Sequence, residues 1–91
     1  MTQIEGLFSV HEVAVRCGVE VTFVEQLVEI GVISVHSTAE RRFEREVTLR
    51  VNRLVRLQRD LGVNLEGAAV IIELLDRIDG LERRLRHLEG R

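Results

Sequence analysis

Apolar side chains recur at helical spacing in four stretches of the chain, and a glycine or a capping residue separates each stretch from the next. The first predicted helix covers residues 10–17. Ser9 and Glu12 form a capping-box pattern at its start, and Gly18 provides a stop after its end. We expect its apolar positions to pack on a neighbouring element.

The second predicted helix covers about residues 23–30 and has a cap and a stop of its own. Thr22 is the expected cap, Glu25 completes a capping box, and Gly31 offers a left-handed stop. With the preceding helix it forms a helix-turn-helix unit over residues 7–31. In such a unit, the second helix is the one that would lie in a DNA groove.

A small β-hairpin, or wing, is predicted over residues 32–43. Residues 32–35 are typical of a strand, the next five are polar, and residues 41–43 would return as the second strand. The loop between them lacks the Asn-Gly or Asp-Gly pair that is typical of a tight hairpin turn.

Two further helices are predicted in the second half of the chain. The third covers residues 45–62, ends at Gly62 and carries a face of five arginines. The fourth covers residues 64–89 and begins at the capping residue Asn64. The basic face is typical of a solvated surface that pairs with nearby acids, and the alternative is a contact surface for an acidic partner.

The fourth helix carries two apolar lines of different length. The shorter line occupies only the first half of the helix and consists of Leu65, Ala68, Ala69, Ile72 and Leu75. The longer line is a heptad seam that consists of Ile71, Leu74, Ile78, Leu81, Leu85 and Leu88. We expect the shorter line to pack on the helix's own domain. We expect the seam to form a homodimer interface, because it would otherwise be exposed to water.

The charge pattern bears on the function of this fold. Residues 1–40 contain six Glu and one Arg, whereas residues 41–91 contain twelve Arg and nine acidic residues. Proteins bind duplex DNA through Lys and Arg side chains that replace counterions on the phosphates. The second predicted helix instead offers Glu25, Gln26 and Glu29 at its outward positions, so we expect no DNA to bind there.

The sequence has no pattern that is typical of catalysis, of cofactor binding or of a metal site. His11-Glu12 begins like a zinc-protease motif, but the second His is missing, and the three histidines lack metal-ligand spacing. We expect no enzyme activity, no cofactor and no small-molecule substrate. The single Cys17 is expected to be a small buried apolar side chain.

The expected location follows from the apolar runs of the chain. The N-terminus has no secretion signal, and the longest strictly apolar run, residues 68–72, is too short to span a membrane. We expect a cytoplasmic protein that does not enter a membrane.

Several short segments occur in an order that is found in one family of regulators. They are Phe8-Ser9-Val10, Val13-Ala14, Cys17-Gly18-Val19, Leu27 to Val32, Arg42-Phe43 and Leu57 to Leu65. This order resembles the MerR-like winged helix over most of the chain, which implies a mainly α single domain over residues 1–91. MerR-like regulators usually begin the second helix with Thr-Leu-Arg-x-Tyr, whereas this chain has Thr22-Phe23-Val24-Glu25-Gln26.

A second set of residues lies on the fourth predicted helix: Gly67, Ala69, Leu74, Asp76, Ile78 and Leu81. Their order resembles the chaperone modulator CbpM family, a MerR-like branch that does not act on DNA. The resemblance implies a dimeric adaptor that binds the J-domain of the co-chaperone CbpA, a DnaJ homologue, and restrains its work with a DnaK-class chaperone. It assigns Asp76 to binding of the basic J-domain helix, and helical spacing adds Glu73 and Asp79 as surface neighbours.

Two other functions stay open. One is a DNA-binding transcriptional repressor of the HspR type, which is also MerR-like. The segment from Gly62 to Gly67 resembles that group, and Arg41, Arg42 and Arg45 lie near the predicted wing. The other is a helical dimerisation module that has no J-domain partner.

Overall fold

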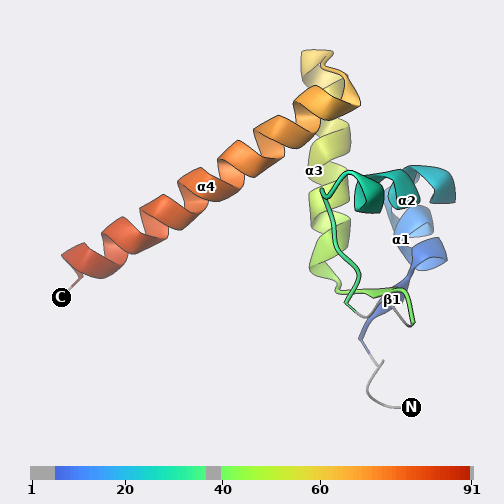
Figure 1. The fold of residues 1–91 in the computed structure, drawn as a ribbon, viewed down its shortest axis with the longest axis horizontal. Coiled ribbons are helices and arrows are strands. Elements are labelled where there is room, and N and C mark those ends of the chain that lie inside the picture. The colour runs from blue at the N-terminus through green and yellow to red at the C-terminus, as the bar shows by residue number, and fades with distance from the viewer. Residues whose placement is uncertain (1–5, 37–39, 91) are drawn as a thin grey trace.

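The computed structural model describes residues 6–36 and 40–90, which form four helices and two short strands. Their order is β1 (Phe8–Ser9), α1 (Val10–Cys17), α2 (Val21–Glu29), β2 (Arg42–Phe43), α3 (Glu46–Leu61) and α4 (Leu65–Glu89). Helices α1, α2 and α3 lie together with the strands, whereas α4 runs from the end of α3 away from the other elements (Figure 1). The predicted class, a mainly α helix-turn-helix fold with a long last helix, is confirmed, and a two-stranded antiparallel sheet stands where a β-hairpin wing was predicted.

Local signals set the ends of three helices as predicted. At the start of α1, the Ser9 hydroxyl accepts a hydrogen bond from the Glu12 N–H, and the Glu12 carboxylate accepts one from the Ser9 N–H at 2.7 Å. This reciprocal pair is the expected capping box. The left-handed Gly62 (φ 68°) ends α3, and the Asn64 side chain accepts a backbone hydrogen bond in the first turn of α4.

The start of α2 differs from the prediction. The helix begins at Val21, and Glu20 takes the capping position without a side-chain hydrogen bond. Thr22 lies inside the first turn, so the predicted capping box of Thr22 and Glu25 is wrong. The reason is that the Glu20 carbonyl already accepts the Val24 N–H at 3.2 Å, which closes a turn before Thr22 could cap one.

The two strands pair antiparallel and bring the start of the chain against the segment before α3. Phe8 lies opposite Phe43, and Ser9 lies opposite Arg42. Both phenylalanine side chains are buried in the core. The strand at residues 42–43 was predicted, but its partner, β1, was not.

Residues 32–35 do not form the predicted first strand of a hairpin. Val32 and Ile33 are both buried, with exposed fractions of 6% and 3%. Consecutive strand residues point to opposite faces, so a half-buried strand cannot bury both of these side chains. The segment is a loop instead, and it stays beside β2, because the His36 N–H donates to the Arg42 carbonyl at 2.6 Å. Residues 37–39 of the predicted wing lie outside the described residues.

One hydrophobic core connects the helix-turn-helix segment, β2, α3 and the first half of α4. Its largest fully buried side chains are Phe43, Leu27, Leu54, Ile72, Val13, Val24 and Val51. Ala68 is also fully buried, and Leu65 and Ala69 pack against this core. The prediction that the shorter apolar line of α4 packs on its own domain is therefore confirmed for these residues.

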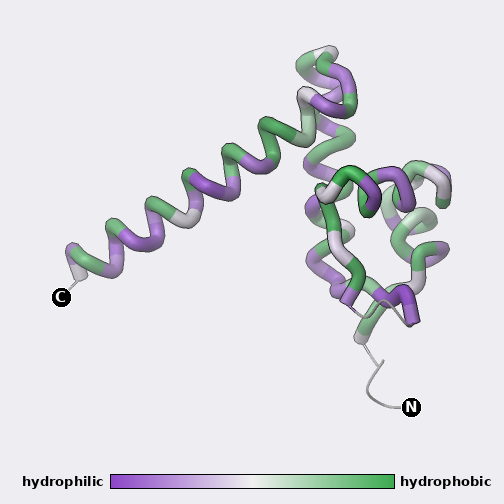
Figure 2. Tube along the Cα trace, viewed as in Figure 1, coloured by the Kyte–Doolittle hydropathy of each residue, from purple (hydrophilic) through white to green (hydrophobic). Residues whose placement is uncertain are grey.

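The second half of α4 extends beyond this core. Every residue from Arg77 to Glu89 is exposed except Gly80, which is half-buried. Figure 2 shows hydrophobic residues recurring along this arm to its end. None of the described helices combines the length and the hydropathy that are needed to cross a membrane.

Cys17 is partly buried at the end of α1 and packs against the core, close to the predicted environment. Its Sγ donates a weak hydrogen bond to the Thr48 carbonyl at 3.6 Å. Burial raises the pKa of the Cys17 thiol, because the charged thiolate is less well solvated there. This environment favours the unreactive thiol form.

Candidate functional site

The three acids predicted to bind a partner follow one another at three-residue intervals along α4, in different surroundings. Glu73 and Asp79 are exposed. Asp76 is only partly exposed, and its carboxylate contacts α3. The structure therefore places the three residues on one stretch of helix without making them one continuous patch of accessible carboxylates.

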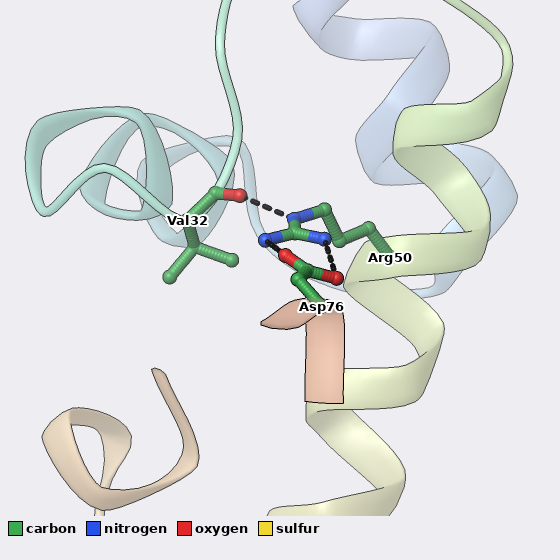
Figure 3. A network of polar contacts seen from close by, with 3 residues as sticks. All are labelled: Val32, Arg50 and Asp76. Atoms are coloured by element: carbon green, nitrogen blue, oxygen red, sulfur yellow. Dashed lines mark hydrogen bonds and ion pairs between the residues drawn. The ribbon is translucent and has the colours of Figure 1, made fainter. Parts of the chain in front are cut away.

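Arg50 on α3 connects two other parts of the protein (Figure 3). Its two terminal nitrogens donate to both carboxylate oxygens of Asp76, at 3.1 and 2.6 Å. Its Nε donates to the Val32 carbonyl at 2.6 Å. The planar guanidinium group suits this two-pronged geometry, which Lys could not reproduce. Arg50 thus ties α4 and the loop after α2 to α3.

The charge of Asp76 is stabilised by this contact. The hydrogen bonds from Arg50 lower the pKa of the Asp76 carboxyl, partial burial opposes the shift, and the charges of Arg50 and Arg53 add to the lowering. Asp76 is therefore ionised at neutral pH and already has a partner within its own chain. This arrangement indicates a role in positioning α4.

Arg50 was not predicted as a site residue. In the sequence it is one of five arginines on the same helix, and its residue type does not distinguish it from the others. Its partner Asp76 is 26 residues away. The only available signal was the position of Arg50 next to the buried Val51, at the edge of the apolar face of α3.

The outward face of α2 is acidic, as predicted. Glu25, Gln26 and Glu29 are all exposed, and with Arg41 they line a shallow hollow. The Arg41 guanidinium lies 3.9 Å from the Glu25 carboxylate. A basic side chain near the wing thus faces an acid on the helix that would enter a DNA groove, and Glu25 would repel a phosphate there.

Arg45, which is also near the predicted wing, contacts groups of its own chain. The Arg45 guanidinium lies over the Phe8 ring, 5.2 Å from its centroid, and the Arg45 Nε donates to the Gly6 carbonyl at 3.2 Å. The hydrogen bond from the Ser9 backbone lowers the pKa of the Glu12 carboxyl, and the charge of the nearby Arg42 adds to the lowering. These contacts reduce the basic surface that a phosphate could meet.

The heptad seam of α4 is largely exposed in the single chain. Ile71 is half-buried, and the exposed members are Leu74, Ile78, Leu81, Leu85 and Leu88. The seam lies mainly on the arm that leaves the core (Figure 2). Exposed apolar residues that continue along one helix face are typical of an interaction surface.

In the part of the chain that the structure describes, no group of three or more His, Cys, Asp or Glu side chains could hold a metal ion. The features described above are charged side chains and exposed apolar surface, and interfaces between macromolecules contain both.

The helix-turn-helix unit, followed by β2 and a long last helix, defines a fold of a DNA-binding type. In this chain, the outward face of α2, the helix that would enter a DNA groove, is acidic. The chain belongs to the family described as MerR HTH family regulatory protein, which matches residues 8–90.

A shorter stretch resembles proteins with a more specific name. Over 31 residues the chain is 55% identical to the Chaperone modulatory protein CbpM of Coxiella burnetii strain Dugway 5J108-111, and it is equally similar to that of strain RSA 331 / Henzerling II. The stretch is 34% of this chain and covers only 29% of each relative. No solved structure matches the chain. The expected resemblance to the CbpM branch of the MerR-like family is confirmed.

Proposed function

We propose that the protein is a non-enzymatic adaptor that binds the J-domain of a DnaJ-like co-chaperone of the CbpA type and modulates its activity. The observation that carries the proposal is the acidic outward face of α2, where Glu25 and Glu29 stand in a fold of DNA-binding type. The name Chaperone modulatory protein CbpM, borne by relatives that are 55% identical over 31 residues, supports it. We propose that the adaptor acts in the cytoplasm.

The chemistry of recognition is electrostatic complementarity. The resemblance to the CbpM family implies a partner that presents a basic helix, so the adaptor needs accessible carboxylates. Glu73 and Asp79 on α4 and Glu25 and Glu29 on α2 supply them. Asp76 completes the proposed partner-binding set, with its carboxylate held by Arg50.

We also propose that the adaptor is a homodimer that uses the α4 seam. The exposure of Leu81, Leu85 and Leu88 supports this assignment, because a second copy would remove them from water. Their heptad spacing is that of helices that pack side by side.

Calorimetry with the purified J-domain of the co-chaperone from the same organism tests the proposal. We expect a dissociation constant below about 10 µM, which corresponds to a binding free energy of about −7 kcal/mol. The association should weaken as salt is added, because charged side chains contribute to it. Absence of binding at about 50 µM would sink the proposal. A companion assay measures whether the adaptor reduces J-domain-stimulated ATP hydrolysis by the DnaK-class chaperone.

A transcriptional repressor of the HspR type is the second candidate. Membership of a family described as regulatory, together with the partly exposed Arg42 on β2, favours it. The Glu25–Arg41 contact disfavours it, because it places an acid where a phosphate would lie. A band-shift assay at low salt with the DNA upstream of the gene separates the candidates. A specific complex that weakens steeply with salt would support the repressor.

A further inference from the structure

A groove lies between the end of α2 and the first half of α4. One side is formed by the turn after α2 and the other by α4, with Arg50 of α3 between them. The lining residues that carry the argument are Ile30, Val32, Arg50, Glu66, Val70 and Glu73. We call this feature the α2–α4 groove.

Apolar side chains are exposed on both sides of the α2–α4 groove. Ile30 is 40% exposed on the α2 side, and Val70 is 54% exposed on the α4 side. Ala69 lies beside Val70 and packs against the core. A partner's apolar side chain could cover Ile30 and Val70 together, which would remove their exposed surface from water.

The α2–α4 groove is also acidic. Glu66 and Glu73 are exposed on its α4 side, two helical turns apart. Neither takes part in any ion pair found among the described residues. Arg50 is the one cationic residue in the lining, and its charge is matched by Asp76. The groove therefore presents two unmatched negative charges.

The spacing between the two sides of the groove is fixed by Arg50. One end of its guanidinium group holds the Val32 carbonyl on the α2 side, and the other end holds Asp76 on α4. A groove whose sides are already held in place needs less ordering when a partner binds.

The groove and the heptad seam lie on different sides of α4. Successive helical residues are rotated by about 100°, so Glu66, Val70 and Glu73 are centred about 80° around the helix from the seam. A second copy that covers Leu81 and Leu85 would leave the groove accessible.

We propose that the α2–α4 groove binds a basic amphipathic helix of the partner protein. Such a helix places an apolar residue on Ile30 and Val70, and its Lys or Arg side chains meet Glu66 and Glu73. This inference rests on the proposed function and names the surface that receives the J-domain. Asp76 is a positioning residue in this arrangement, and Asp79 lies outside the groove.

Other occupants fit the groove less well. Nucleic acid is repelled by Glu66 and Glu73, since binding it requires positive charge. A second copy of the chain that inserted its arm here would form a head-to-tail contact, which continues into chains of molecules unless its rotation closes a ring. The seam already offers a second copy a self-complementary surface.

Calorimetry with the J-domain tests the groove through charge reversal. The double variant Glu66→Arg/Glu73→Arg should bind at least about tenfold more weakly than wild type, because two favourable contacts become repulsive. The matched control, Asp60→Arg, reverses an exposed charge on α3 outside the groove and should bind within about twofold of wild type. Circular dichroism verifies that both variants keep the wild-type helix content.

A labelling experiment tests the groove without reversing a charge. In a Cys17→Ala background, Val70→Cys should react with a maleimide at least about tenfold more slowly once the J-domain is saturating. Val15→Cys, on an exposed position of α1, is the control and should react at the same rate with and without the J-domain.

Two outcomes can be distinguished: the α2–α4 groove is not the binding site, or the protein does not bind the J-domain at all. If wild type binds the J-domain, but the double variant binds equally well and Val70→Cys is not protected, the groove is overturned and the adaptor function stands. If wild type does not bind the J-domain, the proposed function fails.

A synthetic amphipathic helix of Leu and Arg then replaces the J-domain as probe. Binding of this peptide that the double variant loses supports the groove, and no binding to wild type overturns it. Groove variants that lower the mass of a dimer would assign the groove to a second copy and also overturn the proposal.

Discussion

Arg50 and Asp76 form a two-pronged ion pair that joins α3 to α4 across 26 residues of sequence. Arg50 also donates to the backbone of Val32, so a single side chain orients α4 relative to the loop that follows α2. The direction in which the arm of α4 leaves the domain thus depends on polar contacts as well as on the burial of Ala68 and Ile72.

Replacing Arg50 by Lys should lower the free energy of unfolding by about 1 kcal/mol. Lys keeps the positive charge but cannot form the paired hydrogen bonds to Asp76 and the bond to Val32 at the same time. Urea denaturation measures the difference. Arg56→Lys, at an exposed position of α3, is the matched control and should change stability by less than about 0.5 kcal/mol. Equal effects of the two substitutions would contradict the stabilising role of the Arg50 contacts with Asp76 and Val32.

The contribution of Asp76 to stability should depend on pH. The folded-state pKa of this carboxyl lies below its ordinary value of 3.8, mainly because of the hydrogen bonds from Arg50. Its stabilising contribution is therefore complete well above pH 3.8 and is lost as the pH falls through the lower, folded-state pKa. In Asp76→Asn, the loss of unfolding free energy between pH 7 and pH 2.5 should be smaller than in wild type. Identical losses in the two proteins would contradict this prediction.

Two capping substitutions should have different effects. Ser9→Ala removes the hydroxyl that accepts the Glu12 N–H and should destabilise the protein by about 1 kcal/mol. Thr22→Ala should change stability by less than about 0.5 kcal/mol, because Thr22 is an exposed residue inside the first turn of α2. Thermal or urea unfolding of both variants provides the comparison. A larger effect at Thr22 would restore the capping box that the sequence predicted.

Light scattering should give the mass of a dimer for wild type at high micromolar concentration. Leu81→Glu should raise the dimer dissociation constant at least about a hundredfold, equivalent to about 2.7 kcal/mol, since each copy would place a charge in the apolar seam. Arg83→Glu is the control, because its position is about 180° around the helix from the seam. A monomer mass for wild type, or dissociation of the control alone, would refute the seam interface.

Much of this fold could be predicted from short-range signals. The limits of α1 were predicted from Ser9, Glu12 and Gly18, which act within one turn of the helix end. Gly62 and Asn64 marked the boundary between α3 and α4 in the same way. Such signals are reliable because the groups that form the cap are neighbours in sequence.

The features that were missed depend on contacts between distant segments. Phe8 pairs with Phe43, and no local pattern identifies a two-residue strand whose partner lies so far along the chain. The contact of Arg50 with Asp76 has the same character. The acidic α2 face and the α4 seam were predictable because helical periodicity alone places those residues, whereas the α2–α4 groove required the packed structure.

If two copies pair along the α4 seam as proposed, the shape of the α4 arm should depend on the concentration of the protein. Residues 77–89 have almost no cover from their own domain, and isolated helices of about this length are marginal in water. When few copies are present, the arm of a lone molecule should unwind and become a substrate for proteases. When copies are abundant, pairing would rebuild the arm and slow its degradation. The lifetime of the protein would then increase with its concentration, which would raise its amount in the cell further. Far-ultraviolet circular dichroism across a dilution series would reveal the loss of helix in the arm.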